Sequence, residues 1–225
     1  MDKWYEVPGK AGTNVIYSRV RLVRNLKEYP FPGRLTKEQS AELSEKLLGG
    51  LTGIASMDQM QYRFTHLERM GDLEKTALLE RRAINRSVMK KKDPTGMILS
   101  EDESTAILLN GDDHVRIQTL QTGLTLERLY ERADKIDDYI SERFDYAFDE
   151  KYGYLTSFPT NVGTGLRAAV VLHLPMLSKN KNFNSLVADM GRFGTQVRGV
   201  YGEGAENFGS LYQISNQKTL GQTER

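Results

Sequence analysis

Three arginines near the N-terminus concentrate positive charge in one short segment. Arg19, Arg21 and Arg24 fall within six residues, although the formal net charge of the 225-residue chain is only +1. Residues 15–21 alternate apolar and polar side chains, which predicts a half-buried strand. Because residues two apart on a strand point to the same face, Arg19 and Arg21 are expected side by side. The balanced total charge gives no electrostatic case for binding nucleic acid or an anionic membrane.

A glycine-bearing loop, Thr160–Arg167, is a second candidate for anion binding. Its two glycines, Gly163 and Gly165, are separated by one residue and allow backbone amides to approach an anion, while Arg167 supplies charge. The same spacing is common in tight turns that lead into strands. Both interpretations stay open for this loop.

A third segment, Asn110–Arg116, joins two carboxylates, an imidazole and a guanidinium. Asp112 and Asp113 lie at a predicted strand junction, where adjacent carboxylates can pair with a cationic substrate or position a nucleophile. A solvated acidic turn is the alternative. His114, taken alone, indicates a structural hydrogen bond rather than a catalyst.

A fourth segment, Arg198–Gly204, places an arginine before a glycine-rich loop that carries one carboxylate, Glu203. A mobile glycine loop with a single charge can close over a substrate. The alternative is a plain hairpin.

Composition excludes several other chemistries. The chain has no cysteine, which rules out disulfides, thiolate metal sites and cysteine nucleophiles. Its three histidines are far apart and lack the spacing of a zinc site. The longest apolar run, Ala168–Leu172, is far shorter than the roughly 18–20 residues of a membrane helix. The N-terminus lacks the pattern of a signal peptide, so the cytoplasm is the expected location.

The elements that must position these residues follow from periodicity. Strands are expected at 15–21, 96–99, 105–109, 114–118, 168–174, 195–200 and 210–215. Helices are expected after the Thr36–Gln39 capping box, after Asp72 with Leu73 facing inward, over 124–144, and over 184–192 with Asn184 as N-cap. Residues 217–225 suggest the start of a further helix. Because the strands follow one another through hairpin-like connections, we expect a single α+β domain over residues 1–225, with a mainly antiparallel sheet flanked by helices.

In their order, four motifs resemble the phosphagen kinases, the ATP:guanido phosphotransferase family, and within it the bacterial protein-arginine-kinase branch. They are SRVRLVRN (18–25), NGDDHVRIQ (110–118), TNVGTGLRA (160–168) and RGVYGEG (198–204). The tetrad Tyr29–Pro32 and the segment Ile214–Gln217 look like that branch too. The resemblance runs from about Asn14 onward and implies one phosphagen-kinase catalytic domain, with a glutamine-synthetase-like fold. It also implies that the family's preceding helical domain and C-terminal continuation are missing.

The resemblance implies a role for each motif. The family arginines that hold the phosphates of ATP fall on Arg19, Arg21, Arg116, Arg167 and Arg198. Forked guanidinium groups match phosphate oxygens, and phosphoryl transfer depends largely on electrostatic grip and alignment. Magnesium (Mg²⁺) would bridge the phosphates with few direct protein ligands, so no metal-ligating residue is expected.

The resemblance also implies a pair of catalytic carboxylates. These fall on Asp112 and Glu203, which would hold the substrate guanidinium and take its proton.

The chain departs from the family pattern in two of these regions. Where the family carries Asn-Glu-Glu-Asp-His, this chain reads Asn110 to His114 with Gly111 and Asp112, so one carboxylate is lost and the other is a methylene shorter. Phe158 stands where the family has a reactive cysteine. Its ring either fills part of the substrate pocket or packs in the core.

Three functions compete at this stage. The leading hypothesis is ATP-dependent phosphorylation of arginine on proteins. The departures at Phe158 and Asp112 motivate the second, a catalytically impaired module that binds nucleotide or arginine. The third is a phosphagen kinase for free guanidino compounds. The resemblance adds adaptor or protease–chaperone partners, and whether the chain forms a homodimer is left open by the sequence.

Overall fold

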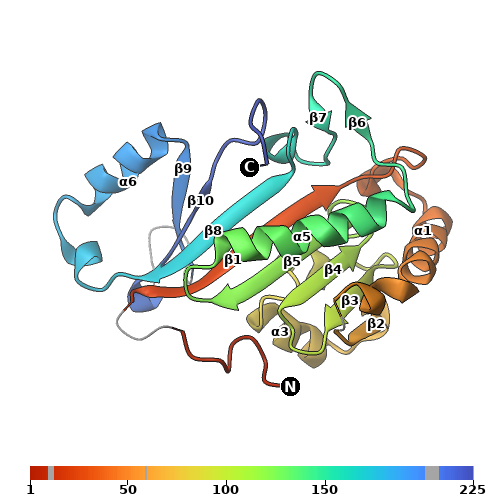
Figure 1. The fold of residues 1–225 in the computed structure, drawn as a ribbon, viewed down its shortest axis with the longest axis horizontal. Helices are drawn as coiled ribbons and strands as arrows, with labels where there is room; N and C mark the ends of the chain where they lie inside the picture. Colours follow the sequence, from red (N-terminus) through yellow and green to blue (C-terminus); the bar gives the residue numbers. More distant parts are fainter. Residues whose placement is uncertain (10–12, 59, 201–207, 225) are drawn as a thin grey trace.

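The computed structural model describes residues 1–9, 13–58, 60–200 and 208–224 and is built on one antiparallel sheet (Figure 1). Within these residues the sheet has eight strands in the order β2-β3-β4-β5-β1-β8-β10-β9, and every neighbouring pair is antiparallel. The strands are β1 Val15–Arg24, β2 Tyr62–His66, β3 Gly96–Ser100, β4 Thr105–Leu109, β5 Val115–Thr122, β8 Leu166–His173, β9 Thr195–Gly199 and β10 Leu211–Asn216. The predicted fold class is confirmed.

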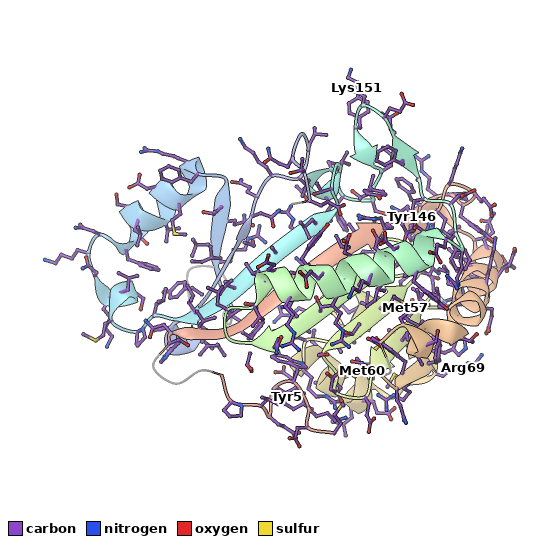
Figure 2. All side chains as sticks on the ribbon, in the orientation of Figure 1. Tyr5, Met57, Met60, Arg69, Tyr146 and Lys151 are labelled. Atoms are coloured by element: carbon purple, nitrogen blue, oxygen red, sulfur yellow. The ribbon has the colours of Figure 1, made fainter. Side chains whose placement is uncertain are left out.

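Helices lie on both faces of the sheet. They are α1 Lys37–Gly50, α2 Ala55–Asp58, α3 Asp72–Glu80, α4 Arg86–Lys90, α5 Leu126–Ser141 and α6 Phe183–Arg192. A small hairpin of β6 (Phe148–Asp149) and β7 (Gly153–Tyr154) stands apart from the main sheet, with Lys151 at its tip (Figure 2). Short 3-10 turns occur at Pro32–Arg34, Thr52–Ile54, Leu67–Arg69, Pro159–Asn161, Leu177–Lys179 and Phe208–Ser210.

The main hydrophobic core lies between the sheet and helices α1 and α5. Alternate strand residues such as Val20, Leu22 and Ile117 pack against Leu47 of α1 and Ile136 of α5, and all of them are buried. Burial of one such side chain contributes about 1.5–3 kcal/mol. A second cluster packs α3 and α4 against the opposite face of β3 and β4. Helix α5 crosses the central strand β1 and covers one of its two faces (Figure 1).

The two best-marked helices form as their patterns predict. Helix α1 begins at a capping box in which the Gln39 amide donates to Thr36 Oγ1 at 3.2 Å and the Thr36 amide donates to Gln39 Oε1 at 3.0 Å. Helix α5 buries one apolar stripe that includes Leu129, Ala133 and Ile140.

Three local predictions were wrong. Gly71 rather than Asp72 caps α3, and Leu73 is 84% exposed because it lies on the solvent side of that helix. Helix α6 begins one residue earlier than predicted, with Asn182 as its N-cap and Asn184 inside its first turn. Residues 217–224 form no helix, since Thr219 Oγ1 instead donates to backbone carbonyls of the 160–162 segment.

None of the helices in the described part of the chain is long and apolar enough to cross a membrane.

Candidate active site

Strand register brings the predicted arginines onto one face of the sheet. Directly opposed residues in an antiparallel pair point to the same face. Arg21 on β1 lies opposite Gln118 on β5 and opposite Arg167 on β8. Arg19 shares that face because it is two residues from Arg21, and Arg116 shares it because it is two residues from Gln118. Four of the five arginines therefore meet on three adjacent central strands.

Arg198 reaches the same face at the edge of the sheet. It lies opposite Gln213 on β10, which lies opposite Val171 on β8, which in turn lies opposite Tyr17 on β1. Tyr17 is two residues from Arg19 and so belongs to the same face. We call the surface that carries Arg19, Arg21, Arg116, Arg167 and Arg198 the arginine face.

The arginine face continues into the side of the sheet that α3 and α4 cover. Arg116 on β5 lies opposite Leu108 on β4, and Leu108 packs in the cluster that contains Val88 of α4. Helix α5 lies on the other face, against Val20 and Leu22. The α3–α4 region therefore lies beside the arginine face, on the same side of the sheet.

Burial and mutual repulsion weaken the charged forms of these arginines. Burial lowers the pKa of Arg21 well below its ordinary value, and the charges of Arg19, Arg116 and Arg167 lower it further. Burial, together with the charge of Arg19, lowers the pKa of Arg116 to about 10. Burial lowers the pKa of Arg167 as well, and the charge of Arg198 adds to that effect. The cluster is therefore electrostatically unfavourable by itself.

No ion pair among the described residues compensates this charge. None of the five arginines has a carboxylate within ion-pair distance among them. The Nε atoms of Arg19 and Arg21 are buried without a hydrogen-bond acceptor in that same set. Arg19 donates from Nη2 to Gln213 Oε1 at 2.6 Å. Since each buried, unsatisfied donor costs about 1–3 kcal/mol, the arginine face is suited to an anion that supplies the missing acceptors.

Arg167 is held in place by neutral acceptors. Its Nη1 donates to the Asn216 carbonyl at 2.6 Å and its Nη2 to the Thr160 carbonyl at 2.7 Å, while its Nε donates to Asn161 Oδ1 at 3.2 Å. These contacts fix the guanidinium, and no carboxylate of the described residues lies within ion-pair distance of it. The guanidinium thus stands preorganised for a negatively charged group.

The glycine loop before Arg167 is a tight turn rather than an amide cradle. The amides of Gly163 and Thr164 donate to the carbonyls of Tyr154 and Thr219 at 3.2 and 3.1 Å. Gly163 and Gly165 have φ values of 110° and 64°, which glycine adopts without a Cβ penalty. The interpretation of these amides as an anion site is wrong, and the alternative of a turn into a strand is confirmed.

Asp112 lies beside the arginine face and is held by side chains of the α4 region. Its Oδ2 accepts from Asn85 Nδ2 at 2.7 Å and its Oδ1 accepts from Ser87 Oγ at 2.6 Å. Its charge partly offsets the lowering of the pKa of both Arg21 and Arg116. A carboxylate and a cluster of guanidinium groups are therefore neighbours.

The adjacent Asp113 is a buried structural group. Its Oδ1 accepts from Asn25 Nδ2 at 2.8 Å and from the Ser157 amide at 2.7 Å. It therefore links the acidic loop to the segment that carries Phe158.

His114 is structural, as its isolation in sequence indicates. Nδ1 accepts from the Leu26 amide at 2.9 Å, so the proton is on Nε2, which donates to the Pro30 carbonyl at 3.0 Å. Burial lowers the pKa of His114 to about 4. The ring is therefore neutral at physiological pH and cannot exchange protons with a substrate without breaking these contacts.

Phe158 does not pack in the core. Its side chain is 51% exposed, and its carbonyl accepts from the Asn161 amide at 2.9 Å. The alternative that places this ring inside the core is wrong. The ring lies at the surface, one residue from the Ser157 amide that holds Asp113.

One further arginine at the site was not predicted. Arg82, in the α3–α4 connection, has a positive φ of 68°, and its carbonyl accepts from Gln118 Nε2 at 2.5 Å. After the dominant effect of burial, its charge is one of the factors that lower the pKa of Arg19. The adjacent Arg81 turns the other way and pairs with Glu103 at 2.8 Å. The only sequence signal was an arginine pair just after a predicted helix.

Glu203 and the rest of its glycine loop lie outside the described residues, so its predicted place in the site stays a prediction. Arg198, on β9, is exposed.

Three comparisons relate this chain to known proteins. Residues 45–225 match the family model described as ATP:guanido phosphotransferase, C-terminal catalytic domain. The chain is 38% identical over 225 residues to a protein-arginine kinase of Halothermothrix orenii, covering 100% of this chain and 64% of that protein. It is 42% identical over 210 residues to a protein-arginine kinase of Clostridium kluyveri, covering 93% of this chain and 61% of that protein. The chain therefore spans less than two thirds of the length of these relatives.

Two solved structures share the fold. One is the duplicated taurocyamine kinase from Schistosoma mansoni with bound transition state analog components, at a TM-score of 0.84 and 27% identity, covering 96% of this chain and 31% of that one. The other is lombricine kinase, at a TM-score of 0.80 and 25% identity, covering 93% of this chain and 61% of that one. The similarity thus includes the sheet that carries the arginine face.

Proposed function

This chain belongs to the ATP:guanido phosphotransferase family, and from that premise we propose that it transfers the γ-phosphoryl group of ATP to arginine side chains of proteins. The observation that carries the proposal is the uncompensated arginine face. The protein acceptor is favoured by the relatives at 38–42% identity that are named protein-arginine kinases. The acceptor nitrogen is that of a guanidinium group.

The arginine face would bind the triphosphate. Its five guanidinium groups, from Arg19, Arg21, Arg116, Arg167 and Arg198, offer forked donors to phosphate oxygens, and the orphaned Nε atoms of Arg19 and Arg21 would gain acceptors. Negative phosphate charge would also relieve the repulsion that now lowers the arginine pKa values. In the transition state these groups stabilise the charge on the transferred phosphoryl group.

Asp112 and Glu203 would bind the acceptor guanidinium and take its proton. As the guanidinium nitrogen forms a bond to the γ-phosphorus, the bond from that phosphorus to the bridging oxygen of ADP breaks. The proton that the nitrogen loses goes to a carboxylate, because a guanidinium with a pKa above about 12 is not a nucleophile until it is deprotonated. Asp112 is half-buried beside the arginine face, which suits this role.

Mg²⁺ is the expected companion of ATP. Within the described residues no group of three or more acidic, histidine or cysteine side chains could enclose a metal ion. Mg²⁺ keeps water ligands and binds readily through substrate phosphates, so the chain fits an ion that the arginines hold indirectly, through those phosphates. When bound, the ion offsets phosphate charge.

The proposal extends to the setting of the reaction. We take residues 1–225 as one catalytic domain that works in the cytoplasm, where ATP is available. Arginine-containing proteins are the proposed substrates, and adaptor or protease–chaperone proteins the proposed partners, by resemblance. A homodimer is compatible with this proposal and is not required by it.

The direct test is incubation of the chain with ATP, Mg²⁺ and an unfolded, arginine-rich protein. We expect acid-labile phosphoarginine, located by mass spectrometry, and none on a substrate in which lysine replaces every arginine. Absence of signal at high enzyme concentration overturns the proposal. Faster transfer to free arginine than to protein arginine would instead favour a phosphagen kinase for free guanidino compounds.

The same assay tests the catalytically impaired alternative, which rests on exposed Phe158 and shortened Asp112. That alternative expects ATP binding without turnover, and turnover only after Phe158→Cys combined with Asp112→Glu. Rapid turnover by the unmodified chain rules it out.

A further inference from the structure

Both oxygens of Asp112 are engaged at the N-terminal turn of one short helix, α4. Asn85, the N-cap of α4, donates from Nδ2 to Asp112 Oδ2 at 2.7 Å, and Ser87 donates from Oγ to Asp112 Oδ1 at 2.6 Å. The Oδ1 of the same Asn85 accepts from the Val88 amide at 3.0 Å. One asparagine therefore caps the helix and holds the carboxylate.

The backbone of the acidic loop is fastened to the same helix region. Lys91, just after α4, donates from Nζ to the Asn110 carbonyl at 2.7 Å and to the Gly111 carbonyl at 2.8 Å. A Cβ at position 111 would lie only 3.2 Å from Val88 Cγ2. Gly111 thus lets α4 approach the loop closely, rather than leaving the loop loose.

These contacts orient the carboxylate without neutralising it. Asn85 and Ser87 are uncharged donors, so these two hydrogen bonds do not cancel the negative charge of Asp112. That charge acts on Lys91, Arg21 and Arg116. Each carboxylate oxygen has two lone-pair sites, so one donor on each oxygen leaves a second site on both. That leaves room for two N–H groups of a planar guanidinium.

Position matters more for this acid than for a longer one. Aspartate has one methylene fewer than glutamate, and a misplacement of about 1 Å can cost roughly a hundredfold in rate. A short acid on an unsupported loop would be poorly placed. Helix α4 supplies the support through four contacts that reach side chain and backbone alike.

We propose that Asn85 and Ser87 are positioning residues that set the place of Asp112 for the acceptor guanidinium. The inference rests on the proposed function, because it assigns Asp112 to the acceptor site. It assigns α4 to acceptor binding and not to nucleotide binding.

The test compares acceptor and nucleotide parameters in variants of the full chain. Ser87→Ala removes one donor, and we expect the KM for an arginine-containing peptide to rise about tenfold while the KM for ATP changes less than twofold. Ser87→Thr keeps the hydroxyl and should restore the KM. Asn85→Asp keeps the capping acceptor but turns a carboxylate toward Asp112, so a loss of about a hundredfold in kcat/KM for the peptide is expected.

A matched control separates positioning from helix capping. Thr36 caps α1 through its Oγ1 and does not contact Asp112. Thr36→Ala therefore weakens a helix cap far from Asp112 and should leave the peptide KM unchanged, whereas Ser87→Ala keeps the Asn85 cap of α4 and should raise it. Equal effects of Ser87→Ala on the ATP and peptide parameters, or a Thr36→Ala variant that reproduces its peptide defect, would overturn the inference.

A binding measurement keeps the inference testable if no transfer occurs. With ADP and Mg²⁺ present, titration calorimetry with the same peptide should show about tenfold weaker binding to Ser87→Ala than to the unmodified chain. Absence of turnover in the unmodified chain counts against the proposed function alone. Equal peptide affinities of the two proteins count against α4 as the positioning element.

Discussion

Arg21 and Arg24 lie three residues apart on β1 and have opposite electrostatic surroundings. Arg24 is fully buried on the α5 side, donates from Nη2 to Asp137 at 2.6 Å and to Glu224 at 2.9 Å, and stacks 3.6 Å from the centre of the Tyr154 ring. Burial alone would lower its pKa, but the two carboxylates raise it. Arg21 has a strongly lowered pKa and no carboxylate within ion-pair distance among the described residues.

The surroundings of Arg24 are completed by tyrosines. Tyr146, near the C-terminal end of α5 (Figure 2), donates from Oη to Asp137 Oδ1 at 2.9 Å. Arg24 is therefore paired with two carboxylates, and one of these, Asp137, also accepts a hydrogen bond from Tyr146. The two arginines show that residue type alone does not identify a binding site. A buried charge without an ion-pair partner is the more informative feature.

The comparison predicts that Arg24 serves stability. Arg24→Gln leaves Asp137 buried without its cation, and we expect a loss of about 3–5 kcal/mol in the free energy of unfolding. Urea denaturation followed by circular dichroism measures this loss. An Arg24→Gln protein that unfolds at the original urea concentration would contradict the assignment of Arg24 to the structure.

The reverse outcome is predicted for Arg21. Arg21→Gln removes an unpaired charge from the arginine face, so the free energy of unfolding should be unchanged or higher. Removal of one preorganised donor should reduce kcat for phosphoryl transfer by about 100-fold to 1,000-fold. Rate assays and urea denaturation of the same preparation give both values, and a large loss of stability would break the distinction from Arg24.

Much of this contrast could be predicted from the sequence. The two-residue period of β1 placed Arg19 and Arg21 together, and the motifs around Arg116 and Arg167 brought in the adjacent strands. The helix expected over residues 124–144 forms as α5, with its apolar side chains in the core. These features depend on local periodicity, which can be recognised from consecutive residues of the sequence.

The remaining features depend on contacts between distant residues. Glu224 reaches Arg24 across 200 positions, and no local pattern marks that pair. Helix α4 has only five residues, too few for a periodic signal, so its hold on Asp112 was not predicted. The sequence left open whether the amides of the 160–167 loop bind an anion, because acceptors such as the Thr219 carbonyl lie far away in the chain.

The contribution of a buried structural group to stability can be tested by measuring the free energy of unfolding at different pH values. The pKa of His114 is lowered by burial to about 4, against about 6.5 in the unfolded chain. As pH falls from 6.5 toward 4 the unfolded state takes up a proton that the folded state refuses, so stability falls by about 3 kcal/mol across that window. Urea denaturation at several pH values should show this slope reduced in His114→Gln.

The contradicting outcome is a pH slope that does not depend on His114. A slope between pH 6.5 and 4 that is as steep in His114→Gln as in the unmodified chain would show that His114 is not the buried neutral group that the structure indicates.

The smallest effect is expected at the adjacent arginines after α3, because Arg82 acts on Arg19 whereas Arg81 pairs with Glu103. Arg82→Gln should raise the KM for ATP about tenfold, equivalent to about 1.4 kcal/mol, because Arg82 adds charge beside Arg19 on the arginine face. Arg81→Gln breaks the ion pair with Glu103 and should change the free energy of unfolding but not the KM for ATP. Steady-state kinetics at varied ATP concentration measures the KM, and urea denaturation of both variants measures the free energy of unfolding. If Arg81→Gln raises the KM as much as Arg82→Gln, charge near the site acts diffusely, and the effect of Arg82 on Arg19 does not distinguish it from Arg81.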